Sequence, residues 1–118
     1  AAGGTGIGVY QAAKDNGKYA IGVDSNQNYL HPGTMLTSML KRVDVAAYNV
    51  FKSANDGSWK SGIQVLGLKE GGIDWALDEH NKNLISPAMK AAVEKAKASI
   101  IAGEISVHDY MSDNKCPK

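Results

Sequence analysis

The chain has 118 residues, enough for one domain, and its 43% hydrophobic and 21% charged residues are typical of a folded globular protein. Thirteen basic and 12 acidic residues nearly balance, so the sequence offers neither the basic surface that binds nucleic acid nor an acidic tail. No apolar run approaches the roughly 20 residues that cross a bilayer. Cys116 is the one cysteine, which excludes a disulfide within the chain.

The first half of the chain alternates between helical and strand patterns. Helically spaced apolar residues over 7–16 predict a helix, and the apolar run 19–23 predicts a buried strand. A polar loop over 24–33 separates this strand from a second one over 35–40. Over 43–54, apolar residues recur at i, i+3, i+4 and i+7, which predicts an amphipathic helix with one buried stripe.

The second half predicts a hairpin followed by a helix. Apolar runs over 63–68 and 73–77 flank a glycine-bearing turn, which is typical of two paired strands. Ser86 and Pro87 then supply a cap and a first-turn proline for a helix over 89–100. The alternation of strands and helices indicates an α/β fold with a mainly parallel sheet, whose two faces helices must cover.

Residues 3–8 form a glycine-rich loop, Gly-Gly-Thr-Gly-Ile-Gly, at the start of the first predicted helix. Glycines let backbone N–H groups approach a ligand at a helix N-terminus, where the partial positive charge suits an anion or a polar oxygen. The loop resembles a dinucleotide-binding fingerprint imperfectly, because Val9 stands where the third glycine belongs. Either this loop contacts a ligand or it is a tight strand-to-helix turn.

Asp24 directly follows the predicted strand 19–23, so it lies at the edge of the sheet where open α/β folds bind ligands. A carboxylate there can accept two hydrogen bonds from vicinal hydroxyls, as on a ribose, and the alternative is a cap of the following loop. Lys41 and Arg42 end the next strand. They either face the same crevice as Asp24 or form a solvated pair before the helix.

Catalytic and metal-binding patterns are weak. His31, His80 and His108 share no metal-ligand spacing, and no nucleophile stands beside a base. Asp78, Glu79 and His80 are adjacent polar residues in a loop, which favours solvation over catalysis. These patterns disfavour an enzyme, and they predict neither a metal nor a cofactor.

Five runs of the sequence together resemble the basic membrane protein family, also known as the PnrA-like purine nucleoside receptors. They follow the family's order and spacing and extend over essentially the whole chain: residues 1–6 (AAGGTG), 21–25 (IGVDS), 27–30 (QNYL), 36–44 (LTSMLKRVD) and 107–110 (VHDY). No single run is specific, but the set is.

The resemblance implies a type I periplasmic-binding-protein fold, in which two α/β lobes joined by three crossing segments hold a ligand between them. It implies an extracytoplasmic solute-binding protein, lipid-anchored at the cell membrane or periplasmic. Such a receptor delivers a purine nucleoside (guanosine, inosine or adenosine) to the permease of an ABC transporter without catalysis. The alternatives are an NAD-type dinucleotide-binding enzyme and a sugar-binding protein of the same fold.

Four residues match family motifs that line the cleft: Gly3, Gly4, Asp24 and Lys41. The resemblance implies that Asp24 accepts the ribose hydroxyls, and that Lys41 hydrogen-bonds the ligand or holds the carboxylate in place. Asn26 stands where relatives often carry Asp, which lowers the local negative charge and leaves its part open.

The resemblance also implies that the chain is the C-terminal part of a receptor, with the lipid anchor and the aromatic residues that stack on the base preceding it. Residues 1–33 then belong to one lobe, 34–42 to a hinge crossing, 43–101 mostly to the other lobe, and 102–118 to a return segment and tail. Because neither lobe is complete, we expect the chain to fold with the remainder of the receptor or to self-associate.

Overall fold

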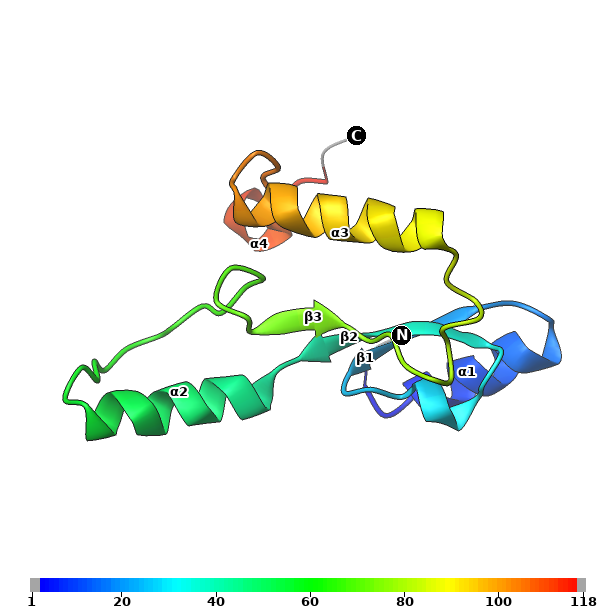
Figure 1. The fold of residues 1–118 in the computed structure, drawn as a ribbon, viewed down its shortest axis with the longest axis horizontal. Coiled ribbons are helices and arrows are strands. Elements are labelled where there is room, and N and C mark those ends of the chain that lie inside the picture. Colours follow the sequence, from blue (N-terminus) through cyan, green and yellow to red (C-terminus); the bar gives the residue numbers. More distant parts are fainter. Residues whose placement is uncertain (1–2, 117–118) are drawn as a thin grey trace.

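The computed structural model describes residues 3–116, whose arrangement Figure 1 shows. Its elements, in chain order, are α1 (Gly6–Asp15), β1 (Ala20–Asp24), the 3₁₀ helix η1 (Asn28–Leu30), β2 (Met35–Lys41), α2 (Val43–Asn55), β3 (Ile73–Trp75), α3 (Pro87–Ile101) and α4 (Tyr110–Asp113). The predicted α/β class is confirmed, and both strands predicted in the first half of the chain are present.

The three strands form one mixed sheet in the order β1-β2-β3. β1 and β2 are parallel, with Asp24 opposite Leu40, and β3 runs antiparallel to β2, with Ile73 opposite Lys41. Because β1 and β2 are parallel, their carboxyl ends meet at one edge of the sheet. This register places Asp24 beside the last residues of β2.

A small apolar core fixes α1 on the sheet. The buried side chains of Tyr10, Ala20 and Met35 come from α1, β1 and β2 and form one cluster, and Ala13 and Leu30 pack against its margin. Of the stripe that the spacing predicted, Tyr10 is buried and Ala13 partly buried, while Ile7 stays 58% exposed. The helix thus holds the start of both parallel strands through Tyr10.

α3 lies on the other side of the sheet from α1 (Figure 1). Its N-terminus is capped as predicted: the Ser86 hydroxyl accepts a hydrogen bond from the Met89 N–H, and Pro87 takes the first helical position. Lys97 Nζ contacts Asp74 Oδ1 at 2.9 Å, which ties the helix to β3. The two faces of the sheet thus carry different helices, although α3 buries none of its residues there.

The predicted hairpin is wrong. Residues 63–68 form no strand and instead lead into a turn, in which the Gly72 N–H donates to the Gly67 carbonyl. β3 exists, but it pairs with β2 rather than with its sequence neighbour. An apolar run forms a strand only when a neighbouring strand can take its backbone hydrogen bonds. β2 pairs with β3 in this way, and residues 63–68 have no such neighbour in the described structure.

α2 extends away from the sheet (Figure 1). The helix is confirmed, but its predicted buried stripe is not: α2 has no buried residue, and Phe51 is 76% exposed. The chain is correspondingly extended, with a radius of gyration of 16.8 Å against roughly 13.5 Å for a compact domain of this length. Its accessible surface is 8559 Å², whereas a compact monomer of this mass exposes roughly 6200 Å².

Candidate ligand-binding site

Asp24 occupies a strained turn at the carboxyl end of β1. Its φ is 75°, and the Ser25 N–H donates to the Val23 carbonyl at 3.0 Å, two residues back. This combination is typical of a γ-turn with positive φ, a rare conformation that costs a residue with a side chain of the order of 1–3 kcal/mol. Strain of this kind gathers at functional sites, where it aims a side chain.

Lys41 lies beside Asp24, as the parallel strands predicted. Its Nζ is 2.7 Å from Asp24 Oδ1, and the two side chains remain 59% and 52% exposed, respectively. The ion pair holds one carboxylate oxygen and leaves the pair open to solvent. A ligand can therefore reach Asp24 without displacing other protein groups.

An open pocket of about 530 Å³ surrounds this ion pair, lined by residues 24–26 and 40–44. That volume falls within the range of small-molecule sites. Arg42 and Asp44 at its rim are engaged with each other at 2.8 Å. The hydrogen bond from Arg42 lowers the pKa of Asp44 to about 2, and the same bond raises the pKa of Arg42. Because Arg42 and Asp44 form an ion pair with each other, Asp24 and Lys41 are the charged residues of the pocket that can bind a ligand.

Gly3 and Gly4 do not line this pocket. They precede α1, where Gly3 adopts a φ of 72° and its carbonyl accepts from the Gly6 N–H at 3.0 Å. A side chain added at either glycine meets nothing within 4 Å, so both remain open to an approaching group. The structure brings Asp24 and Lys41 together, and a part for the glycine pair stays a prediction.

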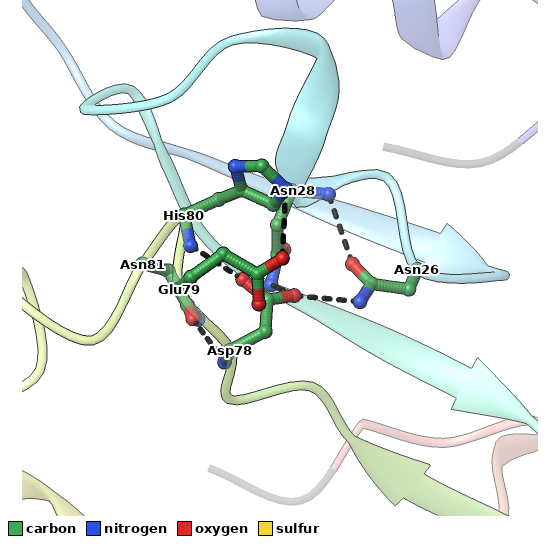
Figure 2. Close-up of polar contacts among 6 residues, drawn as sticks. All are labelled: Asn26, Asn28, Asp78, Glu79, His80 and Asn81. Atoms are coloured by element: carbon green, nitrogen blue, oxygen red, sulfur yellow. Dashed lines mark hydrogen bonds and ion pairs between the residues drawn. The ribbon is translucent and has the colours of Figure 1, made fainter.

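A polar network that the sequence did not predict adjoins the site through Asn26, which lines the pocket (Figure 2). Asp78 Oδ2 accepts from the Asn26 and Asn28 side-chain amides at 2.6 and 3.0 Å, and Asp78 Oδ1 accepts from the His80 N–H at 2.8 Å. Burial alone raises the pKa of Asp78, but these hydrogen bonds and the charge of His80 outweigh it, and the pKa is lowered. Asp78 is thus an anchored carboxylate rather than a solvated one.

The centre of this network is fully buried. Asn28, Ser38 and Asn81 have no exposed surface, and the Ser38 hydroxyl donates to Asn28 Oδ1 at 2.8 Å. The Asn81 side-chain amide donates to the Leu36 and Ala76 carbonyls, both at 2.9 Å. One sequence feature pointed here: Ser38, with Thr37, interrupts an apolar run, and a polar residue in such a strand is buried only with a partner.

The described residues, 3–116, contain no group of three or more His, Cys, Asp or Glu side chains placed to hold a metal ion. Within the same residues, no helix is both long and apolar enough to span a membrane. The site therefore offers the chemistry of an ion pair, amides and backbone, which suits binding of a polar organic ligand.

Comparison with known proteins agrees with a solute-binding role. Residues 1–110 match the family described as ABC transporter substrate-binding protein PnrA-like. The chain therefore belongs to this family, which is a class of solute-binding proteins and not a class of enzymes. The family resemblance that the sequence motifs indicated is confirmed.

Relatives and a solved structure support the same conclusion. The chain is 45% identical over 84 residues to an uncharacterized lipoprotein of Pyrococcus abyssi, covering 65% of this chain and 21% of that protein. It is 34% identical over 124 residues to the ABC transporter nucleoside-binding protein BmpA of Lactococcus lactis, covering 90% and 34%. An ABC transporter solute-binding protein of Aeropyrum pernix superposes with a TM-score of 0.68 at 29% identity, covering 88% and 38%. The chain thus spans between a fifth and two fifths of these proteins.

Proposed function

We propose that this chain is the C-terminal part of an extracytoplasmic receptor that binds a purine nucleoside for an ABC transporter. The observation that carries the proposal is the exposed Asp24 carboxylate, set in a strained turn and held by Lys41 at 2.7 Å in an open pocket. A carboxylate accepts hydrogen bonds only, and its two oxygens suit the vicinal hydroxyls of a ribose. Guanosine, inosine and adenosine all present that diol.

Lys41 has a defined part in this proposal. Its ammonium neutralises the carboxylate in the free receptor and fixes the direction of one oxygen, so that the other faces the ligand. The glycine pair, Gly3 and Gly4, does not line that pocket, and its open backbone near a helix start suits a polar oxygen of a ligand that extends beyond the pocket. The nucleoside-binding relative from Lactococcus lactis supports the choice of nucleoside over sugar.

The partners and location follow from the same class. A substrate-binding protein of an ABC transporter hands its ligand to a membrane-embedded permease, and a relative from Pyrococcus abyssi is a lipoprotein. We therefore assign the receptor to the extracytoplasmic face of the cell membrane, lipid-anchored, or to the periplasm.

The remainder of the receptor is the proposed partner of α2. Phe51 on α2 and Ile63 in the segment after it are 76% and 98% exposed, and the accessible surface exceeds that of a compact monomer by about 2400 Å². Large apolar side chains left exposed along α2 and the segment after it are typical of an interface. Size-exclusion chromatography of this chain alone tests the point: we expect self-association, and a dispersed, stable monomer contradicts it.

The lobe boundaries at residues 33, 42 and 101 remain a proposal. α3 packs on the sheet that contains β1, through the contact of Lys97 with Asp74 and that of Glu94 with the Trp75 indole N–H. These contacts favour grouping α3 with β1 and β2, whereas the proposed boundaries place α3 with α2 in the lobe of residues 43–101.

Replacement of Asp24 by alanine in the receptor tests the function. The variant should weaken inosine binding by more than about 1.5 kcal/mol, the scale of a charged hydrogen bond, and leave binding of the free base hypoxanthine nearly unchanged. Asp56→Ala is the matched control, because this exposed carboxylate accepts from Ser58 and pairs with Lys52 at the end of α2 and does not line the pocket. Isothermal titration calorimetry measures all three proteins. Equal losses for nucleoside and base exclude a ribose role, and tighter binding of a free sugar favours the sugar-binding alternative.

A further inference from the structure

The turn that carries Asp24 needs support from outside itself. A non-glycine residue at a φ of 75° relaxes unless the surrounding structure holds it. Local support comes from Gln27, whose side-chain amide donates to the Val23 carbonyl at 2.6 Å and whose N–H donates to the Ser38 hydroxyl at 3.0 Å. The first contact closes the loop back onto the residue before Asp24, and the second ties Gln27 to β2. They leave Asn26, next to the pocket, to be held by another group.

That group is Asp78. Asn26 lines the pocket beside Asp24, and its side-chain amide donates to Asp78 Oδ2 at 2.6 Å. The Asn26 side-chain oxygen in turn accepts from the Asn28 N–H at 3.0 Å, which closes the loop on itself. Asp78 does not line the pocket, so any effect it has on a ligand passes through Asn26.

Asp78 is itself anchored on the sheet. Its N–H donates to Asn81 Oδ1 at 2.8 Å, and the Asn81 amide bridges the Leu36 carbonyl on β2 and the Ala76 carbonyl just after β3. Buried polar contacts of this kind are rigid, because leaving any one of them unmade costs the desolvation of its partner. Figure 2 shows Asp78 between this anchor and the two asparagine amides.

We propose that Asp78 is a positioning residue for the ligand site: it holds Asn26 and Asn28 so that the strained turn presents Asp24 in its binding conformation. The inference rests on the proposed function for its effect on nucleoside affinity. The ordering of the loop does not depend on any ligand and is tested separately.

The experiment compares Asp78→Asn with Asp74→Asn in the receptor. The first variant keeps the shape of the side chain but places an amide where two amides donate. The second neutralises a carboxylate of the same segment, which bonds Lys97 and lies outside the pocket. Hydrogen exchange of the Ser25 and Asn28 backbone amides reports the loop without ligand, and calorimetry with inosine reports affinity. For Asp78→Asn we expect exchange to rise and affinity to fall, each by about tenfold, and for Asp74→Asn neither.

Each outcome decides. Equal effects of the two variants on exchange, or no effect of Asp78→Asn, overturn the positioning role. Faster exchange with unchanged inosine affinity also overturns it. If the unmodified receptor does not bind inosine, the proposed nucleoside function fails, and the exchange comparison still decides whether Asp78 orders the loop. Should Asp78→Asn not fold, Asn26→Ala breaks the same contact from its exposed side and should give the same two changes.

Discussion

Replacing Lys41 by methionine separates the part of the Asp24–Lys41 pair in stability from its part in binding. Methionine keeps the unbranched chain and removes the ammonium. At 2.7 Å, two unit charges in water attract by about 1.5 kcal/mol before side-chain entropy and salt are counted. Because both side chains are more than half exposed, the net contribution to folding falls below about 1 kcal/mol.

A bound ligand changes this balance. Once water is excluded and the effective dielectric constant falls to about 20, the same pair attracts by about 6 kcal/mol, part of which desolvation offsets. We therefore expect Lys41→Met to leave the free energy of unfolding of the ligand-free receptor within about 1 kcal/mol, while affinity falls by about 1.5–3 kcal/mol.

The assay is a double-mutant cycle with Asp24→Asn, combining urea denaturation of the free protein with calorimetric titration of inosine. If Lys41 acts on the ligand through Asp24, its replacement costs little affinity once Asp24 is neutral. Additive losses refute this reasoning and give Lys41 a contact of its own with the ligand. A loss of more than about 2 kcal/mol of stability without ligand refutes the estimate for an exposed pair.

Two further predictions concern the sheet. A methyl group added at Gly22 would lie 2.6 Å from the Ser38 hydroxyl, which already bonds two neighbours, so Gly22→Ala should destabilise the protein by about 1–3 kcal/mol in urea denaturation, and a neutral result contradicts this packing. Burial raises the pKa of Asp74, but the hydrogen bond from Lys97, the N–H of Trp75 and the charge of Lys97 lower it overall. Its stabilising contribution is therefore present above the unfolded pKa of about 3.9 and is lost as the pH falls through the lowered value. The stability difference between wild type and Asp74→Asn, about 1 kcal/mol at pH 7, should vanish in denaturation at low pH.

Local pattern was enough to predict most helices and the meeting of Asp24 with Lys41. The helices follow from apolar spacing and from the Ser86 cap, and the two charges meet because parallel strands end at the same edge. The failed strand at 63–68 shows the limit of this reasoning. Both this segment and residues 73–77 are short apolar runs, and only the position of β2 decides which of the two pairs.

The polar network around Asp78 could not be predicted from the sequence for a related reason. Asp78 and Asn28 stand 50 positions apart, and each alone is typical of a solvated loop. Their contact depends on β3 running back along β2, a pairing that sequence spacing wrongly assigned to a hairpin. Burial of α2 was overestimated because amphipathic spacing shows which face is apolar without showing what covers it.

The left-handed backbone at position 24 makes the residue that is best for thermal stability different from the residue that is best for ligand binding. Glycine adopts a φ of 75° without penalty, so a screen for heat resistance alone would favour Gly in place of Asp24. Such a variant would melt later and would lack the carboxylate that faces the pocket. Keeping an acid there means accepting a less robust fold for the sake of a prealigned side chain.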